Sequence, residues 1–173
     1  MKNRLNIKRA FKTLVKNGDG RIFVQKLEYE YTTRYLVANA HAIITVTEAD
    51  YEANKEFLQN VTEMDLTEVI RKGTENNPHK VKLTTVSIYC GDVLARVIKG
   101  VGTRCFGVVN EEYISMLYDA GCTLDNFVVN SGATSNIKSP LVEVITSDGK
   151  IEWAYVVLPI MCDVVNVLED VLE

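Results

Sequence analysis

A row of basic residues near the start of the chain is the first set whose spacing suggests a chemical role. Its members share a positive charge and follow, or lie beside, a four-residue repeat: Arg4, Lys8, Arg9, Lys12 and Lys16. Residues four apart share one face of an α-helix, so these side chains would form a stripe. Such a stripe has two interpretations: a contact surface for successive phosphates of a nucleic acid, or a solvated helix face. The absence of any acid before Asp19 favours phosphate contact, because solvated faces usually mix both signs, but it leaves both interpretations open.

The charge of the whole chain is unevenly distributed. Residues 1–26 carry eight Lys or Arg and one acid, a net charge of +7, whereas the other residues carry −11, which together give −4. A basic head on an acidic body suits a partner that is itself strongly charged, either a nucleic acid or a basic protein surface.

Histidines and cysteines offer little further chemistry. The four cysteines are widely spaced and form no Cys-x-x-Cys pair: Cys90, Cys105, Cys122 and Cys162. Together with His41 and His79 they fit no zinc-ligand pattern, so buried, reduced thiols are expected. The sequence also lacks a Gly-rich phosphate loop, a Gly-x-Ser-x-Gly elbow and a His-Glu-x-x-His motif. We therefore expect a protein that is not an enzyme and needs no cofactor or metal.

The basic row requires a helix to position it, and the pattern predicts one over residues 6–16, because Ile7, Phe11 and Leu14 give an apolar stripe. Strands are expected at 21–31, 34–38 and 42–46. The turn at 39–41 places Asn39, a residue that tolerates positive φ, beside His41.

Two helices and three strands are expected in the middle of the chain. A helix over 48–59 would be capped by Thr47, and a shorter helix over 65–72 would be closed by Gly73. Residues 74–79 are expected to form a loop, followed by strands at 82–90, 93–98 and 104–109.

The last third of the chain predicts a helix followed by strands. Asn110 would cap a helix that Gly121 ends. Strands are expected at 126–130, 141–145 and 151–159, with the Asp148-Gly149 turn joining the last two. Four apolar residues should alternate onto one face of the final strand: Ile151, Trp153, Tyr155 and Val157. Residues 163–173 could form an amphipathic helical tail.

Three segments carry a resemblance to a known family. These are Asn110-Glu-Glu-Tyr-Ile-Ser-Met-Leu, Lys138-Ser-Pro-Leu-Val and Tyr155-Val-Val-Leu-Pro-Ile-Met. They resemble the closing module of the bacterial DNA polymerase III beta sliding clamp family. The order of elements indicates an α+β fold with mostly antiparallel sheet. The resemblance implies one DNA-clamp-like domain made of two helix-plus-antiparallel-strand modules, at about 1–47 and 80–162. Short extra helices at about 48–79 would separate the modules, and the helical tail 163–173 would follow.

The resemblance implies a non-enzymatic, DNA-associated or replication-associated binding protein whose first helix contacts phosphates. Duplex DNA and a protein partner are the expected ligands, and a head-to-tail homo-oligomer of about six copies would complete a ring. The second helix departs from this pattern. It offers Glu111, Glu112 and Asp119 and no Lys or Arg, so it should repel phosphates. This suggests a diverged relative, of the kind a phage or mobile element encodes.

A second interpretation assigns the acidic surface to a protein partner. A phage-type inhibitor or adaptor could bind a nucleic-acid-processing complex, for example a host defence nuclease, through that surface. A small enzyme of unrecognised type is the third class. No apolar run approaches the roughly 20 residues of a membrane helix, and no secretory signal pattern opens the sequence, so no membrane contact and a cytoplasmic location are expected.

Overall fold

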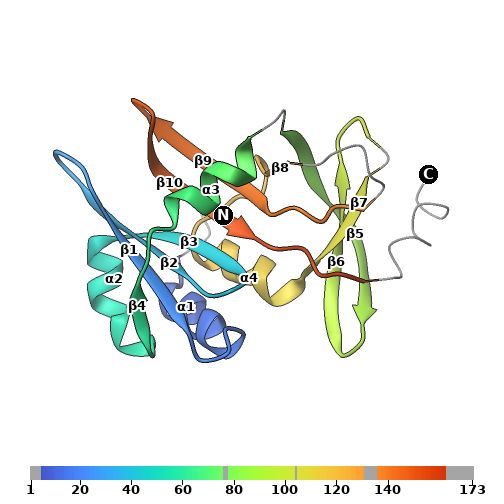
Figure 1. Ribbon diagram of the computed structural model, residues 1–173. Coiled ribbons are helices and arrows are strands. Elements are labelled where there is room, and N and C mark those ends of the chain that lie inside the picture. Colours follow the sequence, from blue (N-terminus) through green and yellow to red (C-terminus); the bar gives the residue numbers. More distant parts are fainter. Residues whose placement is uncertain (1–4, 76–77, 104, 131–135, 163–173) are drawn as a thin grey trace.

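The computed structural model describes residues 5–75, 78–103, 105–130 and 136–162 (Figure 1). Arg4 and the predicted tail 163–173 lie outside the described residues. The helices, in chain order, are α1 (Ile7–Lys16), α2 (Glu48–Asn54), the short 3-10 helix η1 (Lys55–Phe57), α3 (Thr67–Thr74) and α4 (Glu111–Asp119). The strands are β1 (Ile22–Glu28), β2 (Thr33–Ala38), β3 (Ala42–Thr47), β4 (Val61–Glu63), β5 (His79–Cys90), β6 (Val93–Gly100), β7 (Phe106–Asn110), β8 (Val128–Val129), β9 (Leu141–Ser147) and β10 (Lys150–Val157).

The described strands form one mixed sheet in the order β4-β1-β2-β3-β10-β9-β8-β5-β6-β7. Two similar units make up its centre: α1 is followed by the antiparallel strands β1, β2 and β3, and α4 is followed by the antiparallel strands β8, β9 and β10. β3 pairs with β10 and joins the two units, while α1 packs against α4. The prediction of an α+β fold is therefore confirmed.

Local sequence explains both central helices. The side chain of Asn6 accepts a hydrogen bond from the backbone N–H of Arg9 at 3.1 Å, and Asn110 does the same for Glu112 at 2.9 Å. These caps satisfy N–H groups that have no partner within the helix. One face of each helix is apolar and buried, as its spacing predicts: Ile7, Ala10, Phe11 and Leu14 in α1, and Tyr113, Ile114, Met116 and Leu117 in α4.

Both faces of the sheet are covered. The main hydrophobic core lies between the sheet and the pair α1 and α4, and a second core lies on the opposite face under α3 (Figure 1). In β2 the side chain of Val37 belongs to the main core, whereas Leu36 and Ala38 belong to the second. Burial on both faces accounts for the consecutive apolar residues 36–38 of β2 and 42–44 of β3, since neither face is open to water there.

The final strand differs from its predicted pattern. A β-bulge interrupts the pairing of β10 with β9 between Ile151 and Trp153. Trp153, Tyr155 and Val157 pack into the main core as expected, but Ile151 packs into the second core on the other face. The extra residue of a bulge reverses the alternation of side chains, so the prediction of one face for all four residues was wrong for Ile151.

The segment between the two predicted modules adds to both faces and to one edge of the sheet. α2 is shorter than predicted and continues as η1, and both contact α1. β4, which was not predicted, pairs in parallel with the first three residues of β1. Gly73 does not end its helix as predicted but lies inside α3. A Cβ atom there would lie 2.5 Å from Val142 Cγ2, so glycine allows α3 to approach β9 closely.

Asn39 has a larger role than the predicted turn. Its φ is not positive, and its amide is buried. The amide nitrogen donates to the Leu14 carbonyl at 3.1 Å and to the Tyr113 hydroxyl at 3.0 Å, while its oxygen accepts from the His41 N–H at 2.8 Å. Asn39 thus ties the end of α1, α4 and the β2–β3 turn together.

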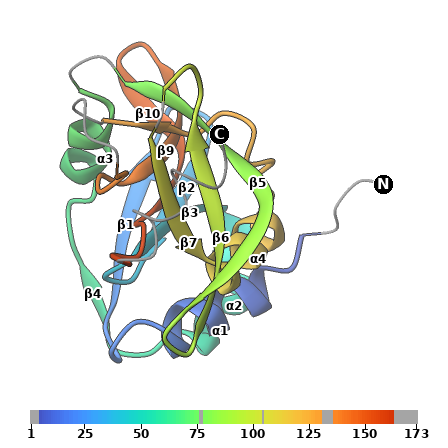
Figure 2. The same ribbon diagram turned by 90° about the vertical axis from the view of Figure 1, so that its right-hand side faces the viewer.

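The chain after β10 returns to the far edge of the sheet. The Ile160 N–H donates to the Val108 carbonyl in β7 at 2.8 Å. β5, β6 and β7 lie at the front in Figure 2. Cys105 and Cys122 are buried as predicted, whereas Cys90 and Cys162 are half-buried. None of the described helices is long and apolar enough to cross a membrane.

Candidate nucleic-acid interface

Lys8 and Lys12 are the two cations of the predicted basic row that lie over an aromatic ring. Both are exposed, and their ammonium groups lie over the ring of Phe57, at 4.8 Å and 5.2 Å from its centroid. Neither forms an ion pair with any described residue. The aromatic face holds the two lysines side by side without neutralising them, since a cation–π contact leaves the charge in place.

Arg9 and Lys16 turn the other way, toward α4. Arg9 Nε donates to Asp119 Oδ2 at 2.6 Å, and its Nη2 donates to Asp119 Oδ1. Lys16 Nζ lies 2.7 Å from Glu112 Oε1. The structure therefore divides the four described cations of the row into two lysines without an ion-pair partner among the described residues and two cations that are paired with α4.

The two pairs favour the charged forms of Glu112 and Arg9. Hydrogen bonds from Lys16 and Asn17 hold the pKa of the Glu112 carboxyl below its usual range. The hydrogen bond to Asp119 raises the pKa of Arg9. The two pairs link α1 to α4.

The acids of α4 are all engaged. Glu111 accepts from Arg96 Nε of β6 at 2.7 Å, Glu112 is paired with Lys16, and Asp119 with Arg9. Because each carboxylate has a cation beside it, the repulsion of phosphates expected from this helix is reduced.

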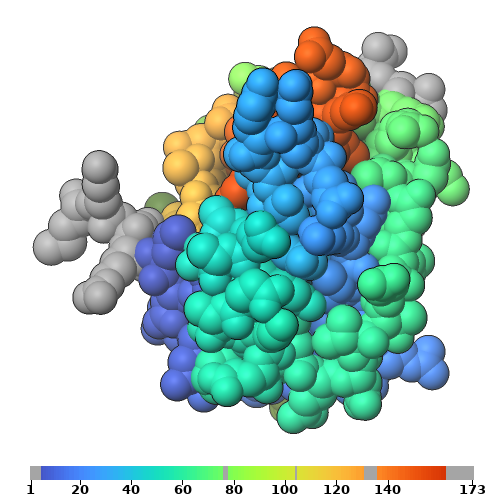
Figure 3. Space-filling model, turned by 90° about the vertical axis from the view of Figure 1, so that its left-hand side faces the viewer, coloured from blue at the N-terminus to red at the C-terminus, as the bar shows by residue number. Residues whose placement is uncertain are grey.

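An acidic surface adjoins the lysines. α2 lies near the centre of the face shown in Figure 3, with α1 on one side and β1 and β4 on the other. Glu48, Glu52 and Glu56 are exposed in α2 and η1, and only Glu52 has a cationic partner, Lys55, among the described residues. This is the acidic surface nearest to the candidate interface.

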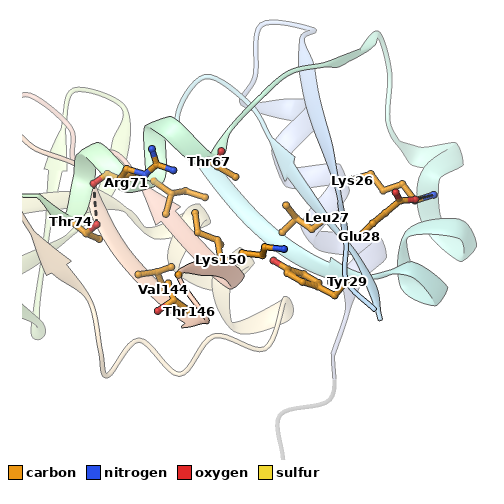
Figure 4. Close-up of a pocket in the computed structure, with 13 residues that line it drawn as sticks. Lys26, Leu27, Glu28, Tyr29, Thr67, Arg71, Thr74, Val144, Thr146 and Lys150 are labelled. Carbon is orange, nitrogen blue, oxygen red and sulfur yellow. Dashed lines mark hydrogen bonds and ion pairs between the residues drawn. The ribbon is translucent and has the colours of Figure 1, made fainter. Parts of the chain in front are cut away.

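A second candidate site is a groove of about 480 Å³ on the opposite face of the sheet. Residues of β1, α3 and the β9–β10 hairpin surround it (Figure 4). Its floor consists of Leu27, Ile70, Val144 and Ile151, which belong to or pack against the second core. This volume is within the range of ligand-binding sites.

Comparison with known proteins found no match: no family model, no curated protein and no solved structure is similar to the chain.

Sequence reasoning missed the groove because its walls come from three segments that are far apart in the chain. It also missed the aromatic support of the lysines by Phe57. The sequence signal for that support is only that Phe57, an aromatic residue, lies within the predicted 48–59 helix. The pairing of Arg9 with Asp119 joins residues 110 positions apart, which no local pattern reports.

Proposed function

We propose that this protein is a non-enzymatic, clamp-like binding protein that contacts the phosphate backbone of duplex DNA through α1. The contacts are made by Lys8 and Lys12, whereas the guanidinium of Arg9 is paired with Asp119. The proposal includes assembly of several copies, because the contacts of one copy are few.

The observation that carries the proposal is the placement of α1. Two helix-plus-three-strand units share one sheet, their helices pack side by side on one face, and the outer side of α1 carries two unpaired lysines. A sliding clamp uses such helix pairs to line its DNA-facing surface, so the arrangement supports the resemblance of the sequence to that family.

The charge balance sets the expected strength of binding. Two unpaired lysines neutralise about two phosphates, so a single copy would bind weakly and with strong dependence on salt. Several copies on one duplex would bind more tightly, because each later contact forms at a high effective concentration.

The test compares two double variants with the same change in charge. Lys8→Glu with Lys12→Glu should abolish binding of a fluorescein-labelled 30-base-pair duplex, measured by anisotropy at low salt. Arg71→Glu with Lys150→Glu alters two exposed cations of the groove on the opposite face and should leave DNA binding unchanged. Equal loss in both variants would show a net-charge effect and would overturn the assignment to α1.

A protein-binding inhibitor or adaptor is the second candidate, and one observation favours it. Arg9 and Lys16 are paired with acids of α4, while α2 and η1 expose Glu48 and Glu56. That surface suits the basic nucleic-acid channel of a nuclease or polymerase. This second candidate function predicts that replacing Glu48 and Glu56 by Lys strengthens DNA binding and abolishes binding to such a channel.

A further inference from the structure

The groove is bounded on one side by an open strand edge. β4 pairs with only the first three residues of β1, from Ile22 to Val24. The chain then leaves the sheet: the Met64 N–H donates to the Val24 carbonyl, and the Leu66 N–H donates to Gln25 Oε1 at 2.6 Å. The second half of β1 therefore has no neighbour on this side among the described strands.

The pairing of β1 with β2 shows which groups face that edge. The Tyr29 N–H donates to the carbonyl of Thr32, the residue before β2, at 2.9 Å. The backbone N–H and C=O groups of Tyr29, and by alternation those of Leu27, therefore point toward β2. Lys26 and Glu28 alternate with Leu27 and Tyr29 along β1. The backbone N–H and C=O groups of Lys26 and Glu28 therefore point away from β2, toward the open edge. No described residue forms a backbone hydrogen bond with these outward groups.

Lys26 and Glu28 line the groove through their backbone. Their side chains pair with each other at 3.0 Å and extend away from Leu27 and Lys150, toward the side of α2 (Figure 4). Tyr35, which lies opposite Lys26 in β2, stacks on Tyr51 of α2 with ring centroids 3.9 Å apart, which confirms the direction of that face. The groove thus presents free backbone donors and acceptors above an apolar floor.

Apart from the Lys26–Glu28 pair, the charged side chains that line the groove are positive. Lys150 has no ion-pair or hydrogen-bond partner for its side chain among the described residues. Arg71 pairs only with Glu68, one helical turn earlier, at 2.7 Å. Exposed pairs of this kind contribute little, so Arg71 can exchange partners. No carboxylate of the lining points inward, because Glu28 points to the other face.

We propose that the groove binds an extended, acidic segment of a partner protein, which adds as a strand to the open edge of β1. The segment hydrogen-bonds with the backbone of Lys26 and Glu28. On the face of the segment that lies over the groove, apolar side chains pack on Leu27 and Ile70, and carboxylates lie beside Lys150 and Arg71. Main-chain pairing of this type gives affinity, and the charges select the sequence. This interaction is separate from DNA binding by α1.

The first experiment uses four fluorescein-labelled acidic decapeptides with threonine at every second position. The positions between, which share one face of a strand, carry valine or isoleucine together with aspartate or glutamate. Saturable binding by anisotropy is expected for the acidic peptides. A matched peptide with lysine at the acidic positions should bind at least tenfold more weakly. An acidic peptide with N-methyl groups on alternate amides should not bind, because it cannot pair with a strand edge. No binding by any of the four acidic peptides up to 1 mM would overturn the proposal.

Variants then locate the site. Glu28→Pro removes the outward N–H without breaking a bond to β2, and it should abolish binding, whereas Glu28→Gln should not. Arg71→Glu with Lys150→Glu should weaken binding at least tenfold, while Lys8→Glu with Lys12→Glu should leave it unchanged. Thermal melting verifies that each variant folds. Peptide binding that survives both Glu28→Pro and the double reversal would contradict the assignment. Loss of DNA binding alone would leave this proposal intact.

Discussion

Arg9 and Asp119 form a side-on ion pair that joins the first and last helices of the described fold. Arg9 is exposed over 65% of its side chain, whereas Asp119 is exposed over only 7%. Removing Arg9 and removing Asp119 should therefore have different effects on stability. An exposed guanidinium can be rehydrated, but a buried carboxylate without its donors cannot.

This asymmetry predicts unequal effects of two substitutions. Arg9→Ala leaves the buried Asp119 carboxylate unpaired and should lower the free energy of unfolding by about 1–3 kcal/mol. Asp119→Asn should have a smaller effect, because Arg9 returns to water. Urea denaturation of both variants, with Lys16→Ala as an exposed-pair control, measures the difference. A larger loss in Asp119→Asn than in Arg9→Ala would contradict the geometry.

Gly73 is predicted to be required for the close packing of α3 on β9. Gly73→Ala would place a Cβ atom 2.5 Å from Val142 Cγ2, in the second core, where Val142 is fully buried. Overpacking of this kind destabilises by about 1–3 kcal/mol, more than the gain from replacing glycine in a helix. The double variant Gly73→Ala with Val142→Ala should lose less than the two single losses added together. Strict additivity in urea denaturation would show that the two residues do not meet.

Tyr155 predicts a loss of stability at alkaline pH. Burial raises the pKa of its hydroxyl, which donates to the Ala120 carbonyl at 2.9 Å. As the pH rises through about 10, the unfolded chain loses this proton while the folded protein keeps it. The contribution of Tyr155 to the free energy of unfolding should therefore be fully retained below pH 10 and fall above it. Thermal melting from pH 8 to 11 measures this fall.

Tyr155→Phe is the control for that dependence. It removes the titrating group and one hydrogen bond, so it should lower stability at pH 7 by about 1 kcal/mol and fall less steeply above pH 10. Parallel profiles for the wild type and Tyr155→Phe would mean that other groups cause the alkaline loss.

Local sequence predicted the parts of the fold that local interactions determine. The caps at Thr47 and Asn110, the apolar stripes of α1 and α4, and the Asp148-Gly149 turn depend on residues a few positions apart. In that turn both residues have positive φ, as such a hairpin requires.

Features that depend on distant contacts were not predictable in the same way. β4 has three residues, all exposed, and exists because β1 supplies its partners. The bulge in β10 follows from the register with β9. The position of Gly73 within α3 needs a residue without a side chain because Val142 lies beneath it. The basic row was visible in the sequence. Which of its members lie over Phe57 and which pair with α4 depends on the helices that α1 contacts.

The most direct test of the central claim is the salt dependence of duplex binding by the full chain. If Lys8 and Lys12 of one copy contact the backbone, a plot of log K against log salt has a slope of about −2 per bound copy, and Lys8→Glu with Lys12→Glu removes it. Stoichiometry from analytical ultracentrifugation supplies the number of copies. Absence of binding at low salt, or a slope that the double variant does not change, would contradict DNA binding by α1.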